Sequence, residues 1–184
     1  RWVKGPEGKK FGEEFAEWCG AVSAVPCQSG SAALWAAMRI LDIGPGDEVI
    51  VPGMTFIATA TSVSLVGATP IFADIEEDYW CICPEDVEAK ITDKTKAVIG
   101  VHLFGQAFSP KLRDICDKYQ IALVEDAAQA HGTTLNGVKA GAIGDVACFS
   151  FFPSKNMAVG GEGGMITTMR KDLAQRMSRL VDHG

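Results

Sequence analysis

A lysine and an aspartate in this sequence each follow an apolar segment and could do chemistry. Asp126 comes directly after the expected strand 121–125, and Lys155 follows the expected strand 145–151. A side chain at the carboxyl end of a buried strand faces the ligand crevice of an open α/β sheet, and an apolar setting favours the neutral, nucleophilic form of a lysine. Lys155 could therefore bond to a carbonyl compound, and Asp126 could stabilise a protonated ring nitrogen. Taken alone, Lys155 could instead be a solvated surface lysine, and Asp126 could instead cap the next turn.

A second chemical signal is the Ser29-Gly30-Ser31 segment, between an expected strand and an expected helix. Unpaired N–H groups and the positive end of the helix dipole suit a phosphate there, and glycine permits its close approach. A serine that only caps the helix is the alternative. The glycine-rich segment 160–164 runs into a strand rather than a helix, so we interpret it as a turn needed for tight packing near Lys155.

Composition excludes several classes of protein. The 184 residues are 47% hydrophobic and 22% charged, with a formal charge of -6 and no basic cluster, which argues against disorder and against nucleic-acid binding. No apolar run reaches the roughly 18 to 20 residues that span a bilayer, and no signal peptide is evident. The six scattered cysteines lack the paired spacing of a zinc site. We therefore expect a cytoplasmic protein with reduced thiols, no metal and no membrane partner.

The elements that must position these residues alternate between strands and helices. Continuous apolar runs at 97–101 and 121–124 predict strands buried on both faces, so the fold class is α/β with a mostly parallel sheet. Helices are expected at 8–19, 32–41, 56–66, 84–91, 110–119 and from about 171, and strands at 21–26, 48–52, 69–73, 96–103, 121–125, 145–151 and 165–168.

Six short motifs occur in an order that resembles one family. They are SGSAAL, TFIATA, VHLFGQ, EDAAQAHG, SFFPSK and GEGGMITT. Together they resemble the pyridoxal-phosphate-dependent sugar aminotransferases of the DegT/DnrJ/EryC1/StrS family, from about residue 5 to residue 184. The resemblance implies the fold-type-I architecture of aspartate aminotransferase, whose large domain has three α/β/α layers and a mostly parallel sheet with one antiparallel strand.

The resemblance also bears on domain organisation. Family members are roughly twice this length and have a smaller C-terminal domain. We therefore expect residues 1–184 to be the large domain that binds pyridoxal 5′-phosphate, truncated at both ends and without the small domain.

The family pattern assigns the chemical roles to three residues. By resemblance, Lys155 is the lysine that bonds to the cofactor and carries a proton during catalysis, and Asp126 binds the pyridine nitrogen and keeps it protonated. Gln129 resembles the residue that contacts the phenolic oxygen of the cofactor.

Four further residues are implied to hold the cofactor. Gly30, Ser31 and Ser150 resemble the phosphate ligands, and Phe56 matches the position whose ring stacks on the pyridine. A core phenylalanine on a helix is the alternative for Phe56.

The implied reaction is transamination of a keto group on a nucleotide-linked sugar or a related keto-cyclitol, with glutamate or glutamine as amino donor. A related dehydratase branch has histidine in place of the lysine, so Lys155 favours transamination. The family also implies a homodimer.

Two other functions stay open. One is another fold-type-I enzyme that acts on amino acids and recognises an α-carboxylate, usually through arginine, although the five arginines in helical segments show no evident convergence: Arg39, Arg113, Arg170, Arg176 and Arg179. The other is a noncatalytic, regulatory module that binds the cofactor.

A few titratable residues near these motifs have no catalytic role in this interpretation. We expect His102 and His131 to be hydrogen-bonded structural histidines, whereas His183 cannot be judged. Glu125 should face away from Asp126 and is left unassigned.

Overall fold

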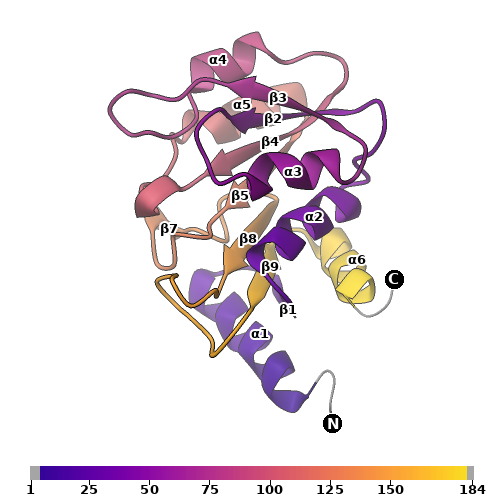
Figure 1. Ribbon diagram of the computed structural model, residues 1–184, viewed down its shortest axis with the longest axis vertical. Helices are drawn as coiled ribbons and strands as arrows, with labels where there is room; N and C mark the ends of the chain where they lie inside the picture. Colours follow the sequence, from indigo (N-terminus) through magenta and orange to yellow (C-terminus); the bar gives the residue numbers. More distant parts are fainter. Residues whose placement is uncertain (1–4, 182–184) are drawn as a thin grey trace.

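A seven-stranded sheet forms the centre of the part of the chain that this computed structural model describes, residues 5–181 (Figure 1). Its strands lie in the order β1-β9-β8-β5-β4-β2-β3. Their bounds are Ser23–Cys27 (β1), Glu48–Pro52 (β2), Thr69–Ala73 (β3), Thr95–Val101 (β4), Ala122–Asp126 (β5), Val146–Ser150 (β8) and Gly164–Thr168 (β9).

Strand direction matches the expected class. β3, β2, β4, β5 and β8 pair in parallel along the sheet. β9 is antiparallel to both of its neighbours, β8 and β1. A mostly parallel sheet with one antiparallel strand is therefore confirmed, and it places the carboxyl ends of β1, β4, β5 and β8 at the same edge.

Helices cover the sheet on both faces, which gives the three layers expected from the sequence. One apolar cluster joins α2 (Gly30–Ile40), α3 (Ala58–Ser64) and α6 (Lys171–Val181) to one face of the sheet. Two other clusters join α4 (Pro84–Ala89), α5 (Lys111–Tyr119) and α1 (Pro6–Cys19) to the opposite face. None of the helices within residues 5–181 is long and apolar enough to cross a bilayer.

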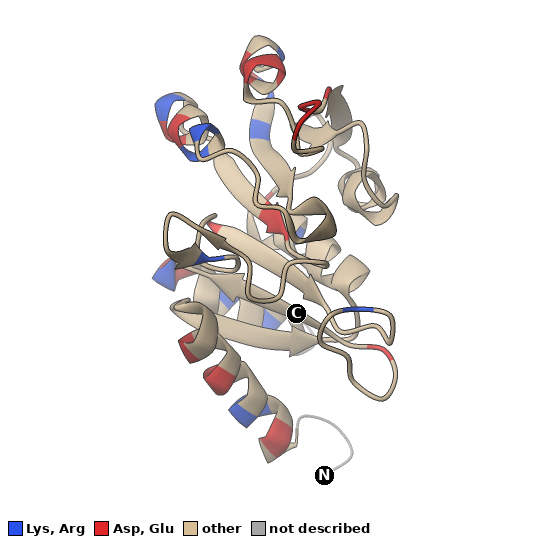
Figure 2. Ribbon diagram, turned by 90° about the vertical axis from the view of Figure 1, so that its left-hand side faces the viewer, with Lys and Arg blue, Asp and Glu red and all other residues tan. Residues whose placement is uncertain are grey.

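The outer surface of α1 carries both signs of charge, as Figure 2 shows along the helix that leads from the N-terminal end. Lys9 pairs with Glu13 and Lys10 with Glu14, each at 3.7 Å. Such exposed pairs contribute little to stability. The buried side of α1, which includes Phe15, attaches it to the sheet.

The six cysteines are free thiols, and burial makes several of them poor nucleophiles. Desolvation raises the pKa of Cys116 to about 12 and that of Cys27 to about 11. These two thiols therefore stay protonated near neutral pH.

The structure differs from the expected elements at three places. The helix expected from residue 56 begins at Ala58, because Phe56 and Ile57 belong to the connection from β2. The first strand, Ser23–Cys27, begins two residues later and ends one residue later than expected. A hairpin of β6 (Thr134–Leu135) and β7 (Val138–Lys139) was not expected from the sequence, although an Asn-Gly pair, which adopts positive φ readily, forms its turn.

The glycine-rich segment before β9 makes one very close contact. A Cβ atom at Gly164 would lie 2.4 Å from the carbonyl carbon and oxygen of Ser29, whereas one at Gly160 or Gly161 would meet nothing within 4 Å. Tight packing is thus found at the end of the segment, where β9 passes the turn before α2, and the close contact there is with Ser29 rather than with Lys155. The middle of the segment faces open space.

Gly164→Ala should destabilise the protein, because the added methyl group has no room against the backbone of Ser29. We expect a loss of about 1–3 kcal/mol, seen as a lower midpoint of thermal unfolding. Gly161→Ala is the matched control and should leave the midpoint nearly unchanged. Equal midpoints for the two variants would contradict the packing described.

Candidate active site

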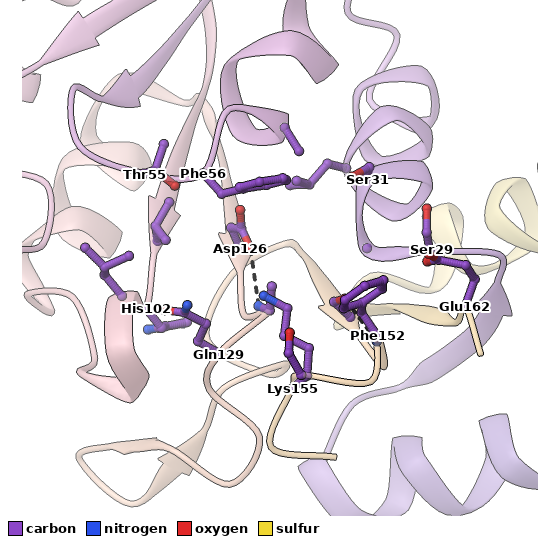
Figure 3. A pocket seen from close by; sticks show the side chains of 18 of the residues that line it. Ser29, Ser31, Thr55, Phe56, His102, Asp126, Gln129, Phe152, Lys155 and Glu162 are labelled. Atoms are coloured by element: carbon purple, nitrogen blue, oxygen red, sulfur yellow. Dashed lines mark hydrogen bonds between the residues drawn. The ribbon is translucent and has the colours of Figure 1, made fainter. Parts of the chain in front are cut away.

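A cavity of about 620 Å³ opens at the sheet edge where the carboxyl ends of the parallel strands meet (Figure 3). All seven residues that the sequence suggested as site residues line it: Gly30, Ser31, Phe56, Asp126, Gln129, Ser150 and Lys155. Ligands of open α/β sheets bind at this edge. The structure thus brings residues from four separate parts of the chain into one place.

Lys155 and Asp126 face each other in this cavity. Figure 3 shows the Lys155 side chain pointing toward the Asp126 carboxylate from the loop that follows β8, while Asp126 is the last residue of β5. A turn holds this loop, in which the N–H of Lys155 donates to the carbonyl of Phe152 at 2.8 Å. An amine and an acid are therefore available to one ligand.

The Asp126 carboxylate is buried, and its surroundings partly compensate for its charge. Only 6% of the residue is exposed, and burial raises its pKa. The Thr59 hydroxyl and the Ala128 N–H donate to its two oxygens at 2.8 and 3.2 Å, and these bonds together with the charges of His102 and Lys155 oppose the rise. A ligand that presents a protonated nitrogen would stabilise the ionised acid further.

The N-terminus of α2 forms the part of the cavity wall that suits an anion. Ser29 caps the helix from an extended backbone, and its Oγ accepts from the Ala32 N–H at 3.1 Å. The first N–H groups of the helix, at Gly30 and Ser31, are those that a helix leaves without internal partners. A Cβ atom at Gly30 would lie 2.7 Å from the Ser150 Cβ, so glycine lets Ser150 approach this terminus. Backbone donors and serine hydroxyls therefore gather where a phosphate could bind.

Phe56 lies over the cavity and not in the core. It is 70% exposed, precedes α3, and lies across the cavity near Asp126 in Figure 3. The alternative of a core phenylalanine on a helix is therefore wrong. An exposed ring in this place can cover the face of a planar ligand.

The orientation of the Gln129 amide is set by a strained turn. The Phe104 N–H donates to Gln129 Oε1 at 2.8 Å, and Phe104 adopts a left-handed backbone with φ 56°. Because the amide oxygen accepts this bond, the amide nitrogen carries the donors that remain for a ligand.

Several residues in or beside the cavity were missed in the sequence. Thr55 lines the cavity, and the hydroxyl of Thr59, four residues later, lies 2.9 Å from that of Thr55. Both belong to the TFIATA motif, but nothing in its pattern indicates that Thr59 reaches Asp126. The remaining missed residues with polar or aromatic side chains on the cavity wall are Gln28, Phe152, Ser154 and Glu162, whereas Ser29 and His102, which also line it, were already singled out in the sequence.

His102 and Glu125 form a buried pair beside the cavity. His102 Nε2 lies 2.9 Å from Glu125 Oε2, and the imidazole stacks on Phe108 with ring centroids 4.2 Å apart. The expectation that His102 is a hydrogen-bonded structural histidine is confirmed.

Glu125 also anchors a loop, a role the sequence did not indicate. Its carboxylate is fully buried and accepts from the N–H groups of Gly141, Ile143 and Gly144 at 2.9, 2.9 and 2.7 Å. Successive residues of a strand face opposite sides, so Glu125 fixes this loop while Asp126 faces the cavity.

The expectation for His131 is wrong in one respect. Its ring packs against Phe149 and Phe151, with centroids 5.3 and 5.5 Å apart, and neither ring nitrogen has a hydrogen-bond partner among the described residues. Burial and the charge of Lys155 lower its pKa, which favours the neutral ring. His131 is thus a packed aromatic residue here. His183 lies outside the described residues.

The arginines that could recognise an α-carboxylate lie elsewhere. Arg113 donates to Asp145 at 3.0 Å, Arg170 pairs with Asp172, and Arg176 pairs with Asp42. Within residues 5–181, no arginine lines the cavity.

Comparison with known proteins finds close relatives. The profile of the DegT/DnrJ/EryC1/StrS aminotransferase family matches residues 1–184. A UDP-N-acetyl-3-dehydro-alpha-D-glucosamine 3-aminotransferase of Acidithiobacillus ferrooxidans is 45% identical over 184 residues, which are 100% of this chain and 50% of the relative. The chain therefore spans about half the length of this curated relative.

Solved structures of similar sequence share the fold. An aminotransferase from Psychrobacter cryohalolentis has a TM-score of 0.97 and 43% identity, over 100% of this chain and 47% of its own. NtdA from Bacillus subtilis, solved with bound cofactor PMP, has a TM-score of 0.92 and 34% identity, over 98% of this chain and 41% of its own.

Glu125→Gln should destabilise the protein, because the new amide NH₂ would face backbone donors that now bind a carboxylate oxygen. We expect a loss of about 2–4 kcal/mol, measured as a lower midpoint of thermal unfolding. Glu88→Gln is the matched control, since Glu88 makes an exposed pair with Lys118 and should matter little. A Glu125 variant as stable as the Glu88 variant would refute the anchoring role.

Proposed function

Because this chain belongs to the DegT/DnrJ/EryC1/StrS aminotransferase family, we propose that its protein binds pyridoxal 5′-phosphate in this cavity and aminates a keto group. The proposed acceptor is a nucleotide-linked sugar or a related keto-cyclitol, and the proposed donor is glutamate or glutamine. The observation that carries the proposal is the placing of Lys155, Asp126 and the N-terminus of α2 around one cavity.

The chemistry of the wall fits each part of this cofactor. The α2 terminus with Ser31 and Ser150 offers donors to the phosphate, and the buried Asp126 suits a protonated pyridine nitrogen. Lys155 offers an amine to the aldehyde. When bound, the cofactor supplies an electron-withdrawing ring that stabilises negative charge at the substrate carbon.

The residues of this chain then have distinct tasks. Lys155 holds the cofactor through Nζ and, once released, moves a proton at that atom. Asp126 keeps the proton on the ring nitrogen, and the Gln129 amide NH₂ donates to the phenolic oxygen. Phe56 covers the ring face and excludes water from it.

The substrate class is supported by two observations. The relative from A. ferrooxidans is named for a keto-sugar nucleotide substrate, and no arginine lines the cavity within residues 5–181 to read an α-carboxylate. We also propose that residues 1–184 act as the cofactor-binding domain of a homodimer. This domain role, the homodimer and the cytoplasmic location stay predictions from the sequence.

Lys155→Ala in the full-length protein should abolish both the visible absorption of bound cofactor and the link that borohydride makes permanent, because no other amine faces the cavity among the described residues. Mass spectrometry of peptides after reduction measures the link. Lys94→Ala, which removes an exposed lysine, should change neither signal. Retention of the link in the Lys155 variant would refute the assignment.

Asp126→Asn should keep part of the cofactor binding while slowing amine formation by about a hundredfold or more, since the amide cannot hold the ring nitrogen protonated. The rate is measured with a panel of keto-sugar nucleotides and glutamate or glutamine. An undiminished rate would remove the proposed role of Asp126. Cofactor colour in the unaltered protein without turnover of any acceptor would favour a noncatalytic module over the proposed reaction.

A further inference from the structure

A chain of two hydroxyl groups leads to the Asp126 carboxylate. Thr59 Oγ1 donates to Asp126 Oδ2 at 2.8 Å, and Thr55 Oγ1 lies 2.9 Å from Thr59 Oγ1. An ionised carboxylate can only accept hydrogen bonds, so the Thr59 hydroxyl must donate its hydrogen bond to Asp126. Thr55 must then donate to Thr59. The two hydroxyl dipoles therefore both point toward the acid, and such chains strengthen each bond in them.

The contact of Thr59 is unlike those of the Thr61 and Ser62 hydroxyls on α3. Ser62 donates to the Thr59 carbonyl at 2.9 Å and Thr61 to the Ala58 carbonyl at 3.4 Å, each within its own helical turn. Thr59, which is fully buried, instead bonds to a side chain 67 residues away. Burial of a hydroxyl without a partner is unfavourable, and α3 offers local partners. The long-range bond thus ties α3 to the end of β5.

We propose that Thr59, oriented by Thr55, is a positioning residue that holds Asp126 ionised and aimed at the ring nitrogen of the cofactor. This inference rests on the proposed cofactor site. With one oxygen of Asp126 bonded to Thr59 and the other to the Ala128 N–H, the carboxylate cannot rotate freely, and each oxygen keeps a lone pair for a ligand. Thr55 directly precedes Phe56, so the same chain of contacts connects the stacking ring to the acid.

The other groups around Asp126 do not replace this bond. The charged or titratable side chains that act on it or adjoin it are His102 directly after β4, Lys155 after β8, Cys148 on β8 and Glu125 on β5 itself. His102 Nε2 and Glu125 already bond to each other, and the Cys148 thiol is neutral because burial raises its pKa. Among residues 5–181, Thr59 is the only residue whose side chain donates a hydrogen bond to the Asp126 carboxylate.

Thr59→Val keeps the shape of the side chain and removes the donor. In cofactor-free, full-length protein labelled with ¹³C at aspartate carboxyls, the Asp126 signal, identified by its loss in Asp126→Asn, should titrate about one pH unit higher in the variant. The direction follows because the Thr59 bond lowers the pKa of Asp126. Affinity for pyridoxal phosphate at neutral pH should fall about tenfold, measured by fluorescence quenching.

Two variants separate positioning from a structural effect. Thr59→Ser keeps a hydroxyl at this position, so the Asp126 titration and the affinity for pyridoxal phosphate should both return toward their original values. Ser62→Ala, like Thr59→Val, removes a buried hydroxyl from α3. Ser62→Ala should leave the Asp126 titration unchanged. The inference is overturned if Thr59→Val titrates and binds as the unaltered protein does, or if Ser62→Ala has the same effect. Failure of the unaltered protein to bind the cofactor would instead overturn the proposed function.

Discussion

The buried carboxylate of Asp126 sets the strongest constraint on this structure. An isolated charge in a protein interior is costly, and a group so placed either takes up a proton or finds compensating partners. Here the partners come from separate elements: the Thr59 hydroxyl from α3, a backbone N–H after β5, and the positive charge of Lys155 from the loop after β8. The acid can serve a ligand only if all these elements keep their places.

The parallel sheet makes that convergence possible. Because β4, β5 and β8 run in the same direction, their carboxyl ends deliver His102, Asp126 and the Lys155 loop to one edge. Successive side chains of β5 point to opposite faces of the sheet, so its two neighbouring acids have different roles. Glu125 anchors the loop at 141–144 on one side, and Asp126 faces the cavity on the other.

The sequence predicts the features that repeat along the chain. Apolar runs of strand length located the buried strands, and their ends located Asp126 and Lys155, because burial on both faces leaves a direct trace in residue type. The motif resemblance added Gly30, Ser31, Phe56, Gln129 and Ser150, and all of these line the same cavity. What these residues do there stays a prediction until a cofactor is bound.

The remaining features depend on contacts that leave no periodic signal. The bond from Thr59 to Asp126 joins residues 67 positions apart, and the four contacts of Glu125 appear only once the loop has folded over β5. His131 was expected to find a hydrogen-bond partner, but it packs among phenylalanine rings instead. The local sequence pattern cannot predict these contacts, because a histidine ring and a threonine hydroxyl each have several possible partners that the sequence permits equally.

The most direct test of the account is a crystal structure of the full-length protein with pyridoxal phosphate. The account predicts that Lys155 Nζ is bonded to the cofactor carbon that carried the aldehyde. It also predicts that an Asp126 oxygen lies at about 2.7–3.0 Å from the pyridine nitrogen. A cofactor bound at another edge of the sheet, or in this cavity with its ring nitrogen turned away from Asp126, would contradict it.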